Sequence, residues 1–117
     1  MTRIEDAVLS VELNHHGPCP PLANVLSRAR GVRSYGCASR ALALVAGGHL
    51  DAHVDIRGRL TPESYLAGAA LVTEAGGSIV GIDGQPLPAT RALTDRVNLI
   101  AAATTALAKA LAKALGR

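Results

Sequence analysis

Apolar residues follow two kinds of pattern along this chain, and stretches rich in Gly or Pro separate them. Alternating or short continuous apolar runs predict strands, at residues 7–13, 32–35, 50–56, 78–82 and 97–102. Apolar residues that recur every three or four positions predict helices, at residues 21–31, 37–46, 62–75 and from 104 or 105 onward. Strands and helices that alternate in this way indicate an α/β fold, with helices covering a sheet.

The individual patterns predict how deeply some elements are buried. Residues 50–56 alternate apolar and polar positions, so we expect a half-buried strand with its polar side chains in water. Residues 97–102 are nearly all apolar, as in a strand buried on both faces. Thr61 is a candidate N-cap for the helix that follows it. Leu107, Leu111 and Leu115 predict a core-facing stripe on the last helix.

Composition narrows the class of protein. The chain has 117 residues, of which 49% are hydrophobic, so we expect a single domain over residues 1–117. Tyr35 and Tyr65 are its only aromatic residues, which leaves little surface for stacking a nucleobase. The net charge of +3 comes from scattered basic residues, so we expect neither a nucleic-acid nor a membrane partner.

Two cysteines are too few for a disulfide framework and favour a reducing, intracellular setting. The first six residues include acidic side chains before any apolar run, unlike a signal peptide. No apolar stretch is long enough to span a membrane. We therefore expect a cytoplasmic protein.

Three ordered stretches carry a likeness to a known family, and each combines two segments: residues 33–38 with 42–52, residues 55–57 with 60–69, and residues 71–77 with 83–84. Together with residues 95–100 they resemble the C-terminal domain of the inositol monophosphatase and fructose-1,6-bisphosphatase superfamily. The spacing from Asp55 to Ser64 is most similar to the archaeal bifunctional type. The likeness covers about residues 31–117, and residues 1–30 are interpreted as a divergent strand, loop and short helix.

The resemblance implies a layered α/β/α domain with a mixed sheet of four to five strands. It also implies an active site shared with an N-terminal half whose carboxylates hold catalytic Mg²⁺. That half, with its Glu and its Asp-Pro-x-Asp-Gly-Thr segment, is expected to be absent. In the C-terminal half the family uses an Asp as metal ligand, and Ser64 occupies that position here. We therefore expect no metal site and no catalytic residue in this chain alone, and Mg²⁺ only where a partner completes the site.

Positions that contact substrate in the family are better preserved. The resemblance places Gly36, Cys37 and Ala38 near the phosphate and sugar, and a Gly followed by a helix start suits an anion. Asp55 matches a residue that accepts hydrogen bonds from sugar hydroxyls. Arg57 lies where a second phosphate could bind, which suits a guanidinium. The alternative is that Gly36 merely starts a helix and that Asp55 and Arg57 are ordinary surface residues.

Two further patterns have simpler explanations. His15, His16 and Cys19 could suggest a metal site, but structural zinc usually needs four ligands, so a solvated loop is favoured. Cys37 lies at a helix start, where a thiol can become more acidic. No base is placed beside Cys37 by sequence spacing, so a nucleophilic role is disfavoured.

Three functions remain open from the sequence. The first is a domain without phosphatase activity of its own that acts as a homo-oligomer or with a separate N-terminal-half chain. Such a domain would leave apolar surface uncovered, and such surface usually finds a partner. The second is a Mg²⁺-dependent phosphatase of inositol phosphate or fructose bisphosphate that a partner subunit completes. The third is a module that binds a sugar phosphate without hydrolysing it.

Overall fold

The computed structural model describes residues 1–14 and 19–116. The chain begins with a short 3-10 helix, η1 (Ile4–Asp6). Five strands follow along the sequence: β1 (Val8–Val11), β2 (Gly31–Arg33), β3 (Ala52–Leu60), β4 (Ser78–Val80) and β5 (Val97–Ala102). Four α-helices lie between or after them: α1 (Pro20–Arg28), α2 (Ala38–Ala46), α3 (Pro62–Glu74) and α4 (Thr105–Leu115).

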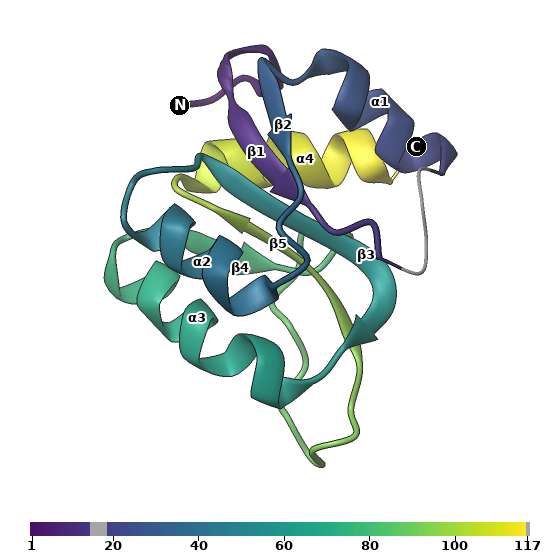
Figure 1. Cartoon of the computed structure of the whole chain (residues 1–117), viewed down its shortest axis with the longest axis vertical. Coiled ribbons are helices and arrows are strands. Elements are labelled where there is room, and N and C mark those ends of the chain that lie inside the picture. The colour runs from purple at the N-terminus through teal and green to yellow at the C-terminus, as the bar shows by residue number, and fades with distance from the viewer. Residues whose placement is uncertain (15–18, 117) are drawn as a thin grey trace.

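The five strands form one mixed sheet in the order β2-β1-β3-β5-β4. β1 runs parallel to both β2 and β3, whereas β5 runs antiparallel to β3 and β4. Figure 1 shows α1 and α4 on one face of this sheet and α2 and α3 on the other. The predicted fold class, a layered α/β/α domain with a mixed sheet, is confirmed.

Alternate residues of the central strands point into two separate hydrophobic cores. On the α1/α4 face, residues such as Leu9, Val54 and Ile100 pack against Leu22 and Leu107. The opposite core joins residues of β5 to α2 and α3, and its members include Leu42, Leu60, Tyr65, Val72 and Leu99. Because helices cover both faces, β3 and β5 have no water-exposed side along most of their length.

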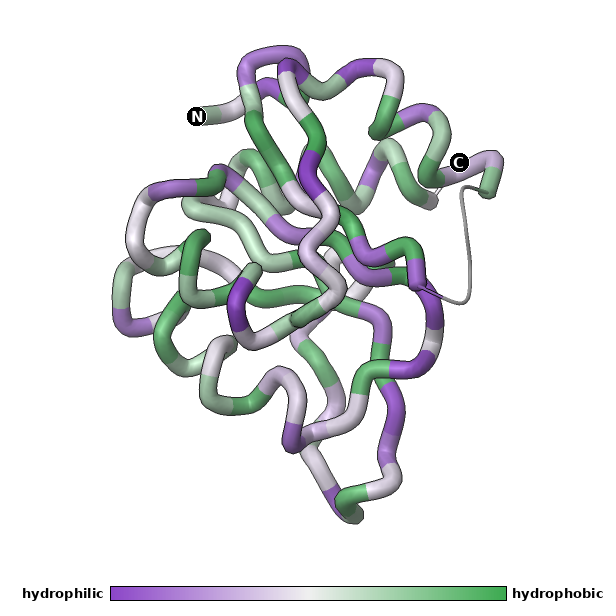
Figure 2. The backbone as a smooth tube through the Cα atoms, in the orientation of Figure 1, coloured by the Kyte–Doolittle hydropathy of each residue, from purple (hydrophilic) through white to green (hydrophobic). Residues whose placement is uncertain are grey.

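Burial of β5 on both faces is confirmed, and so is the core-facing stripe of α4. The prediction that β3 is half-buried with polar residues in water was wrong. His53 and Asp55 are 1% and 0% exposed, and Figure 2 shows hydrophilic segments of the tube within the middle of the sheet. β3 is the central strand and α2 and α3 cover its polar side, so alternation in this strand does not report contact with water.

The helix starts agree with the predictions except for one cap. The side chain of Thr104 accepts a hydrogen bond from the backbone N–H of Leu107, so it caps α4. Thr61 precedes α3 as predicted, but its side chain makes no capping hydrogen bond. Pro62 at the first position of α3 supplies a favourable backbone angle in its place.

A close contact sets the distance between α2 and α3. A Cβ placed on Gly68 would lie 2.6 Å from Cβ of Leu42, so the absence of a side chain lets the two helices approach. No helix of the described residues is long and apolar enough to cross a membrane.

Candidate functional site

The candidate site consists of the substrate-binding residues predicted from the sequence: Gly36, Cys37, Ala38, Asp55 and Arg57. Gly36 has a φ of +68°, a conformation that glycine adopts readily. A Cβ at Gly36 would lie 3.0 Å from Nδ2 of Asn14. The loop before α2 therefore lies directly against Asn14, in the segment that follows β1.

Asp55 and Arg57 form an ion pair on the same face of β3. The Arg57 guanidinium donates from Nε to Oδ1 of Asp55 at 3.0 Å and from Nη2 to Oδ2 at 2.8 Å. The backbone N–H of Arg57 also donates to Oδ1 at 3.1 Å. These bonds, made chiefly by the guanidinium, raise the pKa of Arg57. Both carboxylate oxygens of Asp55 are therefore already engaged by a neighbour on its own strand.

Contacts through Asn14 link this ion pair to the Gly36 loop. Arg57 donates from Nη1 to the backbone oxygen of Asn14 at 3.3 Å. The structure thus brings Gly36, Asp55 and Arg57 into one connected group, although Gly36 lies well before the other two in the sequence.

The first turns of α2 and α3 meet beside each other. Ser39 Oγ donates to the backbone oxygen of Ser64 at 3.1 Å. Ala38 is buried in the core beneath α2, whereas Cys37 is an exposed free thiol. Ser64 therefore lies next to the start of α2, on the side of the sheet where Asp55 is buried.

Sequence reasoning missed a row of buried polar residues under α2 and α3. Ser10 Oγ and His53 Nδ1 share a 2.5 Å hydrogen bond between β1 and β3. Glu12 is 3% exposed and, two residues beyond Ser10, lies on the same side of β1. Period-two spacing of Ser10 with Glu12 and of His53 with Asp55 was the available signal, because adjacent parallel strands align such positions on one face.

Two atoms of this row have no hydrogen-bond partner among the described residues, Nε2 of His53 and Oε1 of Glu12. Burial lowers the pKa of His53 to about 4, with a further lowering from Arg57 and an opposing effect from Asp55. A buried imidazole is therefore neutral at physiological pH. It fixes the β1–β3 contact through Ser10 and carries no charge that would attract a ligand.

The residues present do not fit the Mg²⁺ that the family resemblance implies. Mg²⁺ prefers several ionised oxygen ligands, but both oxygens of Asp55 accept bonds from Arg57. Ser64 offers a neutral hydroxyl where the family has a carboxylate. Within residues 1–14 and 19–116, no three His, Cys, Asp or Glu side chains gather closely enough to hold a metal ion.

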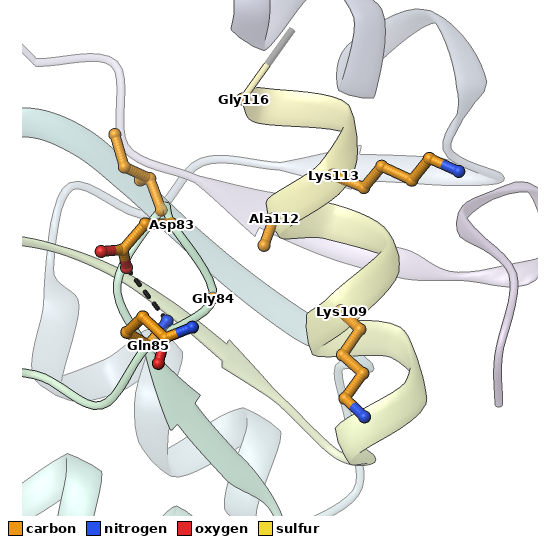
Figure 3. Close-up of a pocket in the computed structure, with 8 residues that line it drawn as sticks. Asp83, Gly84, Gln85, Lys109, Ala112, Lys113 and Gly116 are labelled. Atoms are coloured by element: carbon orange, nitrogen blue, oxygen red, sulfur yellow. Dashed lines mark hydrogen bonds between the residues drawn. The ribbon is translucent and has the colours of Figure 1, made fainter.

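Another cavity lies elsewhere in the molecule and contains none of the predicted site residues. This cavity has a volume of about 620 Å³ and lies between the turn at residues 82–85 and α4. Figure 3 shows that Lys109 and Lys113 extend away from that turn, and Oδ1 of Asp83 accepts a hydrogen bond from the backbone of Gln85. Few polar groups converge on this cavity, so it is not the candidate functional site.

The predicted metal alternative at His15, His16 and Cys19 falls partly outside the described residues, because the two histidines do. Within the described parts of the chain, no hydrogen bond joins the exposed Cys37 thiol to an imidazole or a carboxylate. The assignments of Gly36, Cys37, Ala38, Asp55 and Arg57 to substrate binding remain predictions.

Comparisons with known proteins agree with this fold and arrangement. A model of the inositol monophosphatase family matches residues 5–117. An inositol-1-monophosphatase of Bacillus subtilis (strain 168) is 40% identical over 90 residues, 73% of this chain and 33% of that protein. A fructose-1,6-bisphosphatase/inositol-1-monophosphatase of Thermococcus kodakarensis is 33% identical over 91 residues, 78% of this chain and 36% of that protein. The chain spans about a third of the length of these curated relatives.

Solved structures give the same result. The extragenic suppressor protein suhB from Bartonella henselae superposes with a TM-score of 0.81 at 27% identity, covering 100% of this chain and 45% of that one. A hypothetical protein from Pyrococcus horikoshii with similarities to inositol-1 monophosphatase gives 0.77 at 30% identity, covering 90% and 41%. The matched residues include the segment before residue 31, where no family motif was identified in the sequence. The chain belongs to the inositol monophosphatase family.

Proposed function

We propose that this chain is an inositol monophosphatase-family domain that acts by associating with a second polypeptide surface. Its 117 residues alone do not hydrolyse phosphate monoesters. The observation that carries the proposal is the apolar surface of α3 that faces away from the sheet. We call this surface the outer α3 face, and it consists of Leu66, Ala67, Ala70 and Leu71.

The outer α3 face differs from the exposed side of an ordinary surface helix. Leu66 and Leu71 are 47% and 52% exposed, although the opposite side of α3 already buries Tyr65 and Val72 in the core. A helix at a protein surface usually has a polar outer side, as α4 does with Lys109 and Lys113. The middle of α3 is therefore apolar on both sides, between the exposed Glu63 at its start and the exposed Glu74 at its end, and an apolar exposed patch of this kind is typical of a surface that another element covers.

Two features of the candidate site support the absence of unaided hydrolysis. Ser64 supplies a neutral hydroxyl where metal-dependent chemistry needs an ionised oxygen. Arg57 holds both oxygens of Asp55, with the Asp55 side chain 0% exposed and the Arg57 side chain 13% exposed. Release of Asp55 toward a metal would leave a partly buried guanidinium without its partner, which is costly.

Size-exclusion chromatography with light scattering tests the association directly. We expect a mass above that of the 11.9 kDa monomer, rising with protein concentration as a second copy covers the outer α3 face. The double variant Leu66→Ser/Leu71→Ser should elute as a monomer, with a circular-dichroism spectrum like that of the parent. Leu93→Ser is the matched control, because Leu93 is 74% exposed but lies outside α3.

A parent protein that stays monomeric at the highest accessible concentration would contradict self-association. Association that the α3 double variant leaves intact would contradict the assignment of the surface.

A second candidate function is a Mg²⁺-dependent sugar-phosphate or inositol-phosphate phosphatase completed by a partner subunit. Convergence of the Gly36 loop, Asp55 and the first turn of α3 favours it, because these segments form one connected end of the domain. In that case turnover appears only when a chain carrying the missing carboxylates is added. Full turnover that survives Ser64→Ala would show that Ser64 does not mark a lost ligand position.

A further inference from the structure

A second cavity lies between the first turn of α3 and the segment that leads into β5. Its volume is about 290 Å³, and Tyr65, Thr90, Arg91 and Arg96 are among the residues that line it. The loop between β4 and β5 forms the lower tip of the molecule in Figure 1. None of the five residues of the candidate site lines this cavity.

Two of the residues that line the cavity are arginines whose side chains are available to a ligand. Arg91 and Arg96 are both exposed, and neither has a carboxylate oxygen within 4.0 Å among the described residues. Asp95 also lines the cavity, but its Oδ2 accepts backbone N–H bonds from Arg91 at 2.8 Å and from Ala92 at 3.1 Å. The two arginines outnumber the single carboxylate, so the cavity lining has a net positive charge. The Asp95 carboxylate accepts the hydrogen bonds that stabilise the turn.

Two hydroxyl groups complete the polar lining. Tyr65 is 3% exposed, and its Oη lies 3.5 Å from Oγ1 of Thr90. Hydrogen bonds between oxygen atoms are normally 2.5–3.0 Å long, so this contact leaves both hydroxyls under-satisfied. Thr90 is itself exposed, so both hydroxyls can also donate to an acceptor that enters the cavity.

We infer that this cavity binds a phosphate group, either as free phosphate or as a small phosphate ester. Guanidinium groups pair with phosphate oxygens through two parallel N–H bonds, and the two hydroxyls can donate to the remaining oxygens. The volume lies at the lower limit for drug-sized ligands, so the ligand is small. Apolar atoms of Val97 and neighbouring residues leave room for a short carbon skeleton beside the phosphate. The site does not depend on association through α3 or on a metal ion.

Amide chemical shifts measured during a titration with inorganic phosphate test this inference. The titration is run in EDTA at constant ionic strength, with chloride as the reference anion. We expect saturable shifts confined to residues 88–97 and the first turn of α3. In Arg91→Ala/Arg96→Ala the affinity should fall by at least about tenfold, because two charge-assisted pairs are lost. Arg30→Ala/Arg59→Ala is the charge-matched control, since both arginines are exposed and neither lines the cavity.

Further variants and ligands distinguish the remaining interpretations of the titration. Tyr65→Phe removes one donor without changing the net charge and should also weaken binding. Glycerol 3-phosphate that binds more tightly than inorganic phosphate identifies an ester as the ligand, whereas equal affinity identifies free phosphate. Shifts that do not saturate, or that are the same in the double-arginine variant, would overturn the inference. Shifts centred on residues 36–38 and Arg57 would assign phosphate to the candidate site instead.

Discussion

Acidification should destabilise this domain through the protonation of His53. The ring is 1% exposed, shares one hydrogen bond with Ser10 and has no partner at Nε2 within the described chain. Burial, assisted by the nearby Arg57, lowers its pKa from 6.5 to about 4. The unfolded chain therefore takes up a proton at His53 at a higher pH than the folded domain does.

The size of this effect follows from linkage between protonation and folding. Each unit of pKa difference corresponds to about 1.4 kcal/mol. Protonation of His53 in the unfolded chain therefore lowers the free energy of unfolding by about 3 kcal/mol as the pH falls from the unfolded to the folded pKa. The stability is intact above the unfolded pKa and is lost as the pH falls toward the folded one. At about pH 5 roughly 2 kcal/mol of it should be gone.

Urea unfolding at pH 7.5 and at about pH 5 measures the free energy of unfolding on both sides of this transition. Bonds from Arg28 and from the backbone lower the pKa values of Glu5 and Asp95 respectively, so their contributions to stability are lost only in more acidic solution than this. In His53→Gln, which does not titrate, most of the difference between the two pH values should disappear. His49→Gln removes an exposed histidine and should behave as the parent protein does.

A parent protein with equal stability at the two pH values would refute this reasoning. So would a loss of the same size in His53→Gln, because another group would then be responsible.

Two substitutions test the packing around the candidate site. Arg57→Ala leaves the buried Asp55 carboxylate unpaired and should lower the free energy of unfolding in urea by about 3–5 kcal/mol. Arg59→Ala, on the exposed part of β3, should change that free energy by less than about 0.5 kcal/mol. Equal effects of the two substitutions would contradict the role of the ion pair. Gly68→Ala places a Cβ 2.6 Å from Leu42. The resulting overpacking should cost about 1–3 kcal/mol of stability, of which the better helix propensity of Ala offsets up to about 1 kcal/mol. We therefore expect a lower melting temperature. A rise in melting temperature, or an equal loss in Ala23→Ser, an exposed position of α1, would contradict the close helix contact.

Much of the fold could be predicted from the sequence because helices and strands have different periods. The apolar run of β5 and the four-residue spacing of leucines in α4 each have one simple structural explanation, and both predictions were confirmed. Family motifs gave the mixed sheet and the layered arrangement, which periodicity alone does not specify.

The prediction failed where pairing between distant residues decides the environment. Alternation in β3 looked like a strand with one face in water, but Ser10 bonds to Nδ1 of the buried His53 and Arg57 bonds to both oxygens of the buried Asp55. Nothing in the local sequence of β3 indicates that β1 will place Ser10 beside His53. In the same way, Arg57 could be predicted as a basic residue near the site, but not as the partner that engages both oxygens of Asp55.

Phosphate release from inositol 1-phosphate by the purified chain, in Mg²⁺ with and without EDTA, tests the central claim most directly. We predict no metal-dependent release, because Ser64 and the Asp55–Arg57 pair leave no set of ionised ligands for the metal. Clear turnover that EDTA abolishes would contradict the proposal and would mean that carboxylates from a second copy rebuild the metal site.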